Sequence, residues 1–259
     1  MANKESLNFV WRSELNMPVI KIYYDNVSVS KNIKAAWGFS ALVKYKGRNI
    51  LFDAGGNAEV LSANMKKMGS DPKCIEFVVI SHKHWDHVDG VSAVLPALPA
   101  GRQPSQKVYF LKSFSERLKK RAKASGAKLV EIIKFQKIIP GIYTTGEMGK
   151  TIKEQSLIID TPKGLIIVTG CSHPGIVDIV RHSKKKLKKD IYFVIGGFHL
   201  KTLRAEQVRR IINELKELGV KRIAPCHCTG EKAISIFQKE FQNDFIKIGV
   251  GSIIGTDEI

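Results

Sequence analysis

The decisive stretch of this sequence is His82-Lys83-His84-Trp85-Asp86-His87, which places three imidazoles and one carboxylate within six residues. It directly follows the apolar run Phe77-Val78-Val79-Ile80, whose composition indicates a buried strand. Neutral imidazoles and carboxylates are side chains that hold divalent transition metals. The first two histidines are two residues apart and can point the same way, whereas Asp86 and His87 can face a second ion after a turn. The stretch therefore predicts a strand-end loop that binds two adjacent metal ions.

The length and the cysteine usage favour a cytoplasmic globular protein. A chain of 259 residues can bury a substantial core in one domain, so we expect a single domain over residues 1–259. No apolar run approaches the ~18 residues that a membrane span needs, and residues 1–20 carry scattered charges where a signal peptide has an apolar core. The four cysteines form no C-x-x-C pair, which favours reduced thiols over disulfides or an iron–sulfur cluster. We expect cytoplasmic localisation and no membrane partner.

The net charge is strongly positive, because 42 lysines and arginines face 24 acidic residues and give +18. Such a charge favours anionic partners, in first place a small phosphorylated metabolite and in second place nucleic acid. Two basic runs carry much of it, Lys119-Lys120-Arg121 and Lys184-Lys185-Lys186-Leu187-Lys188-Lys189. Neither run is interleaved with aromatic residues, and both also fit a solvated helix face. A homo-oligomer stays open.

Apolar periodicity and turn residues predict strands first, and then strands that alternate with helices. Residues 37–53 read as a hairpin with its turn at Lys46-Gly47. Helices are expected over 58–68, 88–98, 115–125, 176–187, 205–218 and 231–241. Further strands are expected over 19–24, 77–81, 107–111, 138–145, 156–161, 165–169, 191–195, 221–225 and 245–248, with a loop over 99–104. This order predicts an α/β (α+β) fold, a four-layer αββα sandwich with its chemistry in loops at strand ends.

Three motifs in order carry a family resemblance. The H-x-H-x-D-H loop is preceded by Leu51-Phe52-Asp53-Ala54-Gly55-Gly56 and followed, late in the chain, by Pro225-Cys226-His227-Cys228. Together they resemble the metallo-β-lactamase superfamily. The resemblance implies an αββα sandwich with one or two metals at the edge between two β-sheets. It also implies that Asp53 lies beneath the metal loop and orients it, although a turn residue before the glycines is the alternative, and that His227 is a late ligand.

The chain departs from the superfamily pattern at two places. Gly170-Cys171-Ser172-His173-Pro174-Gly175 stands where the family usually has Gly-Asp, whose Asp bridges the metals. We favour His173 as a ligand there, with Cys171 as a further candidate, because a thiolate can bind a soft metal. A small buried side chain is the alternative for Cys171. Thr144-Thr145-Gly146-Glu147 stands where the family often has Thr-Pro-Gly-His, so Glu147 is a candidate oxygen ligand or an exposed residue.

The resemblance then implies two metal sites. If Glu147 does not bind, His173 completes the first site beside two histidines of the loop, and the second site takes the remaining ligands. The metal ligands expected from the resemblance are His82, His84, Asp86, His87, His173 and His227.

A glycine-rich strand end provides candidates for substrate contact and proton transfer. In Gly196-Gly197-Phe198-His199-Leu200 the glycines let the backbone approach a ligand closely. We expect His199 to be a proton donor or substrate anchor beside the metals, with a helix-start histidine as the alternative, and Asp86 to take part in catalysis with it. Gly197, Phe198 and Trp85 are expected to contact substrate. Trp37 is a weaker candidate, since core packing explains it as well.

The motifs at residues 170–175, 196–200 and 226–230 together resemble one branch of the superfamily, the dihydropteroate-synthase-like 7,8-dihydropterin-6-ylmethyl-4-(β-D-ribofuranosyl)aminobenzene 5′-phosphate synthases. The resemblance implies that a pterin pyrophosphate and an aminobenzene ribosyl phosphate are joined with loss of pyrophosphate. Its cofactors would be two divalent ions, zinc first and manganese, magnesium or iron as alternatives. The alternatives are a binuclear hydrolase of phosphodiesterase, lactonase or lactamase type, a nucleic-acid-processing nuclease, and a non-catalytic metal- or redox-binding protein.

Overall fold

Two β-sheets form the centre of the protein in this computed structural model, which describes residues 17–95 and 106–255. The first sheet has the order β13-β1-β2-β3-β4-β5-β6 and the second has the order β12-β11-β10-β9-β8-β7. The strands of the first sheet are β1 (Val19–Tyr24), β2 (Ser40–Tyr45), β3 (Arg48–Phe52), β4 (Phe77–Val79), β5 (Lys107–Leu111), β6 (Lys128–Ile132) and β13 (Ile253–Ile254). Those of the second are β7 (Lys134–Ile139), β8 (Ile142–Gly146), β9 (Leu157–Thr161), β10 (Gly164–Thr169), β11 (Ile191–Gly197) and β12 (Arg222–Cys226).

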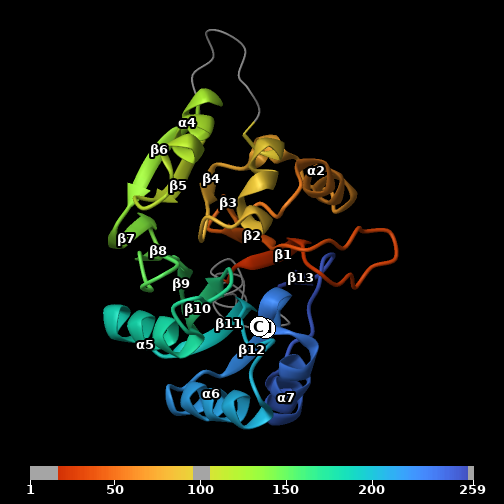
Figure 1. Cartoon of the computed structure of the whole chain (residues 1–259), viewed down its shortest axis with the longest axis vertical. Coiled ribbons are helices and arrows are strands. Elements are labelled where there is room, and N and C mark those ends of the chain that lie inside the picture. The colour runs from red at the N-terminus through yellow and green to blue at the C-terminus, as the bar shows by residue number, and fades with distance from the viewer. Residues whose placement is uncertain (1–16, 96–105, 256–259) are drawn as a thin grey trace, which may run out of the picture.

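Helices cover the outer face of each sheet, so the layers run helix, sheet, sheet, helix (Figure 1). The helices on the first sheet are α2 (Ala58–Lys67) and α4 (Glu116–Ala124), and the short α3 (Trp85–Val88) lies in the loop after β4. Those on the second are α5 (Ile176–Leu187), α6 (Ala205–Glu217) and α7 (Glu231–Phe241). The predicted four-layer sandwich is therefore confirmed. None of the helices described is both long and apolar enough to cross a membrane.

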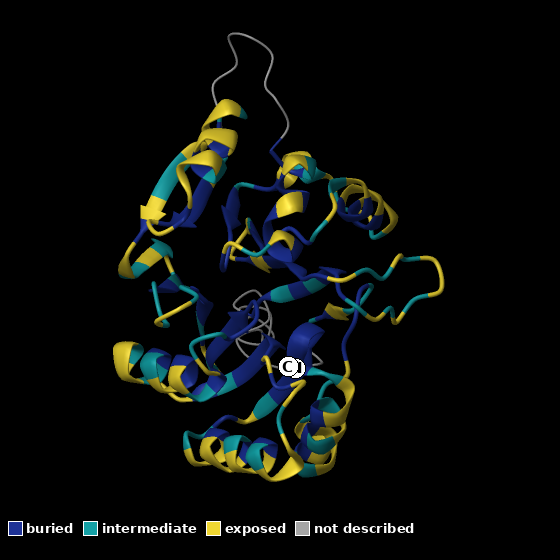
Figure 2. Ribbon diagram, viewed as in Figure 1, coloured by how far each residue is buried: buried dark blue, intermediate teal, exposed yellow. Residues whose placement is uncertain are grey.

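Successive side chains of β10 point alternately into two hydrophobic cores, one on each face of the second sheet. Ile166 and Val168 belong to the cluster between the sheets, whereas Leu165 and Ile167 belong to the cluster beneath α5, α6 and α7. All four side chains are fully buried. Successive strand residues point to opposite faces, so a strand between two apolar layers needs a continuous apolar run. In Figure 2 the central strands are coloured as buried, and the outer faces of the helices that cover them are coloured as exposed.

Several predicted elements were wrong in their bounds or their type. The strand expected over 138–145 is two strands, β7 and β8, because Pro140 and Gly141 make a turn in which Gly141 has a φ of 85°. The helix expected over 88–98 is the short α3 followed by a 3₁₀ turn over Asp89–Ala93, and residues 96–98 lie outside the described residues. The loop expected over 99–104 also lies outside them.

Three strands at the sheet edges were missed or misplaced. β6 and β13 were not expected, and the strand expected over 245–248 is absent from the described structure. Phe245 forms an isolated bridge with Ile223, and pairing does not continue beyond it. The chain instead turns back to the other sheet, where β13 pairs antiparallel with β1.

Gly90 follows the loop of residues 82–87 and packs against the backbone of the loop after β3. Its N–H donates to the Gly55 carbonyl at 3.0 Å, and a Cβ at this position would lie 1.9 Å from the Ala54 oxygen. We expect Gly90→Ala to lower the free energy of unfolding by about 1–3 kcal/mol, because backbone must move to admit the methyl group. Urea denaturation measures this. Gly255→Ala is the control, since a Cβ there meets nothing within 4 Å. Equal midpoints for both variants would contradict the packing role.

Candidate metal centre

The loops that end five strands meet at one edge of the sandwich. These are the loops after β3, β4, β10, β11 and β12, and they contain the predicted site residues. Four non-glycine residues in them have left-handed backbone: Asp53, Ser172, His199 and His227, with φ between 50° and 60°. Such conformations cost energy and cluster at functional sites, where the surrounding structure maintains them. The strained backbone and the gathered side chains together mark this edge as the candidate site.

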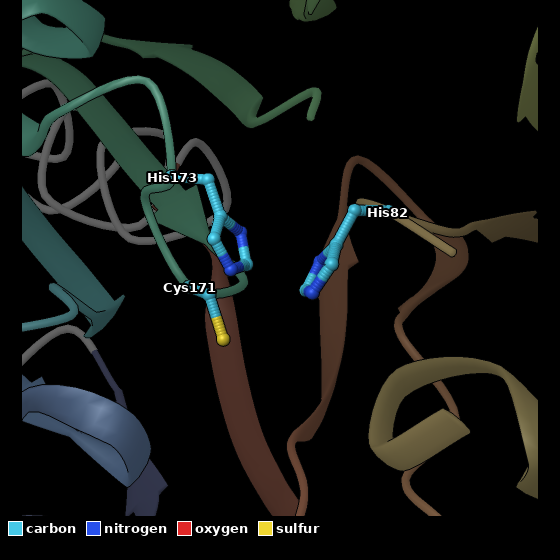
Figure 3. A group of neighbouring side chains, drawn as sticks. All are labelled: His82, Cys171 and His173. Carbon is cyan, nitrogen blue, oxygen red and sulfur yellow. The ribbon is translucent and has the colours of Figure 1, made fainter. Parts of the chain in front are cut away.

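Three histidines form the first group of candidate ligands. His82 Nε2 lies 3.0 Å from His84 Nδ1, and the His173 ring centroid lies 4.6 Å from that of His82 and 5.0 Å from that of His84. Figure 3 shows the His82 and His173 rings facing one another across a small space, with the Cys171 sulfur at its side. The candidate ligand atoms of His82, Cys171 and His173 lie within 4.8 Å of one another. The loop after β4 and the loop after β10 thus converge on one position.

Hydrogen bonds beneath the loop fix which nitrogen of each imidazole is free. Ser81 Oγ donates to Asp53 Oδ2 at 2.7 Å, so the 2.9 Å contact with His82 Nδ1 requires that nitrogen to donate. The same Asp53 oxygen lies 2.7 Å from His87 Nδ1. A donor on Nδ1 leaves the lone pair on Nε2, so both imidazoles present Nε2 to the site. Asp53 therefore occupies the position beneath the loop that the sequence predicted.

A second group lies beside the first. His87, Cys171 and His227 have candidate ligand atoms within 4.8 Å of one another, and Asp86 Oδ2 lies 3.7 Å from His87 Nε2 and 3.5 Å from His227 Nε2. His227 Nδ1 lies 3.1 Å from Asn26 Oδ1 and donates to it. His227 Nε2 is buried and has no hydrogen-bond partner among the residues that the structure describes. A buried nitrogen without a partner is costly, and a bound cation would satisfy it, so these residues fit a divalent metal.

Ionisation of the buried groups suits metal binding. Burial, reinforced by nearby His227, lowers the pKa of His87 to about 3, and burial lowers the pKa of His82 well below its ordinary value. Both imidazoles are therefore neutral near pH 7. Burial opposes the charge of Asp86, but the nearby His227 and His87 outweigh it and hold its pKa below the ordinary range. Neutral imidazole and ionised carboxylate are the forms that bind metals.

Glu154 is a functional residue that the sequence interpretation missed. Its fully buried Oε1 accepts hydrogen bonds from the backbone N–H of Cys171 and of Ser172, each at 2.9 Å. Its Oε2 accepts from the backbone N–H and from Nδ1 of His173, each at 2.8 Å. Burial opposes the charge of this carboxyl, but the bonds from His173 and the nearby His82 lower its pKa below the ordinary value. Glu154 thus shapes the loop after β10 and turns His173 Nε2 toward the first group.

Cys171 lies at the junction of the groups. It belongs to both groups above and to a third with His199 and Cys228, and its Sγ lies 3.3 Å from His87 Nε2. It occupies the place where the sequence pattern of the family has a bridging aspartate. The Cys171 sulfur is therefore within 4.8 Å of candidate ligand atoms of each group.

The remaining predicted site residues take different positions. Glu147 belongs to none of the three groups found among the described residues, and its Oε1 accepts from the Ser113 N–H at 2.7 Å. Trp85 begins α3 with 57% of its surface exposed, whereas Phe198 is buried and packs on Phe237 with ring centroids 5.5 Å apart. Gly197 makes room, because a Cβ there would lie 2.6 Å from Cys228 Sγ. The structure does not bring Glu147 together with the histidines.

A cavity of about 410 Å³ opens beside the first group. His173 and His199 line it, and their ring centroids are 4.7 Å apart. Apolar side chains of α5 and α6 line its walls, and Arg181 lies among them with its guanidinium bonded to Asp178 and Glu214. The candidate ligands therefore border a space large enough for part of a small organic substrate.

An αββα sandwich with imidazoles and carboxylates at its strand ends defines a class of metal-dependent enzymes, and comparison with known proteins gives the family. The family model of the metallo-beta-lactamase superfamily matches residues 38–227. The chain belongs to this superfamily.

Three known proteins are similar to this chain over different shares of its length. The 7,8-dihydropterin-6-methyl-4-(β-D-ribofuranosyl)-aminobenzene-5′-phosphate synthase of Methanocaldococcus jannaschii is 32% identical, over 92% of this chain and 96% of the relative. The crystal structure of Tm1679, a metal-dependent hydrolase of the β-lactamase superfamily, has a TM-score of 0.75 and 26% identity, covering 93% of this chain and 99% of that one. The ribonuclease Z of Aeropyrum pernix is 35% identical over 71 residues, which are 26% of this chain and 22% of the relative. The predicted resemblance to the pterin-related branch is thereby confirmed.

Proposed function

We propose that this protein is a metal-dependent transferase that joins a dihydropterin pyrophosphate to 4-(β-D-ribofuranosyl)aminobenzene 5′-phosphate and releases pyrophosphate. The observation that carries the proposal is the likeness to the M. jannaschii synthase, because it extends over nearly the whole of both chains. A domain shared with many chemistries would support only the fold. Both substrates of the proposed reaction are phosphorylated, and the net charge of +18 favours binding of such anions.

In this proposal the candidate groups hold two divalent ions. His82, His84 and His173 hold the first, and Asp86, His87 and His227 hold the second, with Cys171 between them. Bound there, such ions neutralise charge on phosphate oxygens. Asp53, Glu154 and Asn26 each accept a hydrogen bond from one ligand imidazole and orient it.

Residues around the two groups provide surfaces for an aromatic ring and for anions. Trp37 is 45% exposed, and its ring centroid lies 5.3 Å from that of His227. Lys201 Nζ lies 5.5 Å from the centre of the same ring, so an ammonium group stands beside the second group. Trp85 exposes its ring from within the metal loop. A stacked ring and a phosphate can both be bound here without rearrangement of the core.

The reaction forms one bond and breaks one. The amine nitrogen of the aminobenzene attacks the methylene carbon of the pterin, the carbon–oxygen bond to pyrophosphate breaks, and the amine loses a proton. His199 is exposed at the end of the cavity beside His173 and accepts that proton. Contact with the Cys228 sulfur raises the pKa of His199, so the protonated imidazole is stabilised after the transfer.

The test incubates the metal-loaded protein with both substrates. Mass spectrometry should detect the joined product, and pyrophosphate should appear in equal amount. No product with any of zinc, manganese, magnesium or iron would refute the transferase.

A binuclear hydrolase is the second candidate, and the likeness to Tm1679 favours it. The same assay separates the two activities. A hydrolase would release pyrophosphate or phosphate from one substrate alone and would form no joined product. The likeness to ribonuclease Z covers too little of either chain to favour a nuclease.

Replacing His199 tests the proton acceptor. We expect His199→Ala to retain its stability and the two ions proposed for the transferase, because the side chain is exposed, and to lose about 10²–10⁴-fold in kcat, as is usual for removal of an acid–base group. Steady-state kinetics and metal analysis measure these two effects. Unchanged turnover would remove the role from His199, and loss of either of these two ions would make it a ligand of the first or second group.

A further inference from the structure

We propose that Cys171, His199 and Cys228 form a third metal position, rich in thiolate, that takes a thiophilic divalent ion of the zinc class. This position lies next to the two imidazole-rich groups and uses Cys228, which is not among the ligands proposed for the two ions of the transferase. It does not depend on that activity, because it concerns only what the three side chains can bind, and an ion bound there would prevent His199 from accepting a proton.

The three side chains come from three strand ends. The ligand atoms of Cys171, after β10, His199, after β11, and Cys228, after β12, all lie within 4.8 Å of one another. Cys228 Sγ also lies 3.7 Å from the Cys171 carbonyl oxygen. Two sulfurs on one tetrahedral zinc are about 3.8 Å apart, given zinc–sulfur bonds of about 2.3 Å. Small side-chain rotations therefore bring the three atoms to one ion.

The backbone around these side chains is arranged to admit the sulfur of Cys228. Gly197 has no side chain, and a Cβ there would lie 2.6 Å from that sulfur and 2.4 Å from the Gly170 oxygen. His199 has a φ of 55°, a conformation that costs energy for a residue with a side chain. Both features bring the ends of β11 and β12 together around the thiols.

Cys171 can be a shared ligand and still leave enough ligands for an ion at each of the three positions. His82, His84 and His173 can hold an ion with three imidazoles and do not need the sulfur. Cys171 is then free to bridge the second position, where its sulfur lies 3.3 Å from His87 Nε2, and the third. Thiolate sulfur can bridge two ions because it has more than one lone pair and is polarisable.

The ligand set selects the class of ion and leaves one side open. Two thiolates and one imidazole suit zinc, cobalt(II) and other soft or borderline ions, and they disfavour magnesium and calcium. Both sulfurs are buried, with Cys171 4% and Cys228 6% exposed, whereas His199 is exposed. Three protein ligands with solvent on one side are the arrangement of an open zinc site.

Cobalt(II) titration of the full chain under reducing conditions tests the position. Cobalt bound to thiolate gives a charge-transfer absorption in the near ultraviolet, which imidazole and carboxylate ligands do not give. We expect three equivalents to bind, one for each group. Cys228→Ser should bind one equivalent fewer and lose at least about half of the absorption, because it removes a sulfur donor while preserving size.

The control is Cys226→Ser, which removes another buried thiol that belongs to none of the three groups. It should keep both the stoichiometry and the absorption. If Cys228→Ser does not fold, His199→Asn changes an exposed side chain and should likewise lose one equivalent. Equal stoichiometry and absorption in Cys228→Ser and the unaltered protein, or two equivalents in the unaltered protein, would overturn the proposal. A failed condensation assay leaves these readouts unaffected, so the two proposals fail separately.

Discussion

His84→Ala is expected to lose the ion of the first group and more than about 100-fold in activity while the protein stays folded. His84 Nδ1 lies 3.0 Å from His82 Nε2, a separation at which two nitrogens can bind the same ion. The His84 ring is partly exposed, so its removal leaves the core packing intact. Metal analysis, activity and circular dichroism measure the three effects. Asp86→Ala should remove the ion of the second group in the same way.

His182→Ala is the matched control for these variants. His182 lies in α5, and it belongs to none of the three ligand groups among the described residues. It should retain full metal content. Full metal content in both His84→Ala and Asp86→Ala would contradict the ligand assignment, and equal metal loss in His182→Ala would show that metal content reports only general instability.

The sequence predicted the sandwich because its strong signals were local. A continuous apolar run such as Leu165 to Thr169 must be buried on both faces, and β10 is the strand between two cores. Errors arose where tertiary context decides. Residues 245–248 are apolar enough for a strand, but Phe245 finds only one bridge at the sheet edge. The Pro140-Gly141 dipeptide by itself predicts a turn, but the apolar residues on both sides of it favoured one continuous strand.

The site was predictable where its ligands share a motif. The spacing of the loop from His82 to His87 alone suggested its candidate ligands, and in the structure His82 Nε2 lies 3.0 Å from His84 Nδ1, and Asp86 Oδ2 lies 3.7 Å from His87 Nε2. Which of His173 and Glu147 lies beside the histidines of the loop could be decided only from the three-dimensional structure. Only His173 lies beside His82, whereas Glu147 accepts a backbone N–H elsewhere. The ligand assignments stay predictions until metals are measured.

Glu154 could not be found by motif, because its partners are 15 to 19 residues away in the chain. A signal was nevertheless present. Glu154 and Gln155 stand only two or three residues before the apolar strand β9, and a carboxylate beside a buried strand needs a partner. The structure shows that its partners are the backbone and the imidazole of the loop after β10. Residues that orient ligands rather than bind them leave little trace in spacing.

Glu154→Gln is expected to lower the free energy of unfolding by about 3–5 kcal/mol, because it breaks a buried set of charge-assisted hydrogen bonds. The carboxylate accepts on both oxygens, from backbone N–H groups on each side and from His173 Nδ1. An amide has only one acceptor oxygen, so its NH₂ must face N–H donors that are left unsatisfied. Urea denaturation measures the loss.

The same variant should also weaken the first metal group. Without its acceptor, the His173 ring is no longer held with Nε2 toward His82 and His84, and loss of such an orienting partner lowers metal affinity by about 10–100-fold. Glu147→Gln is the control, since this carboxylate accepts one hydrogen bond, from the exposed Ser113 N–H, and lies outside the ligand groups. It should change stability by less than about 1 kcal/mol and leave affinity unchanged. Competition with a chromophoric chelator measures the affinity. A stable Glu154→Gln variant with full zinc affinity would mean that His173 is oriented by its own loop, and that the buried carboxylate is dispensable to the site.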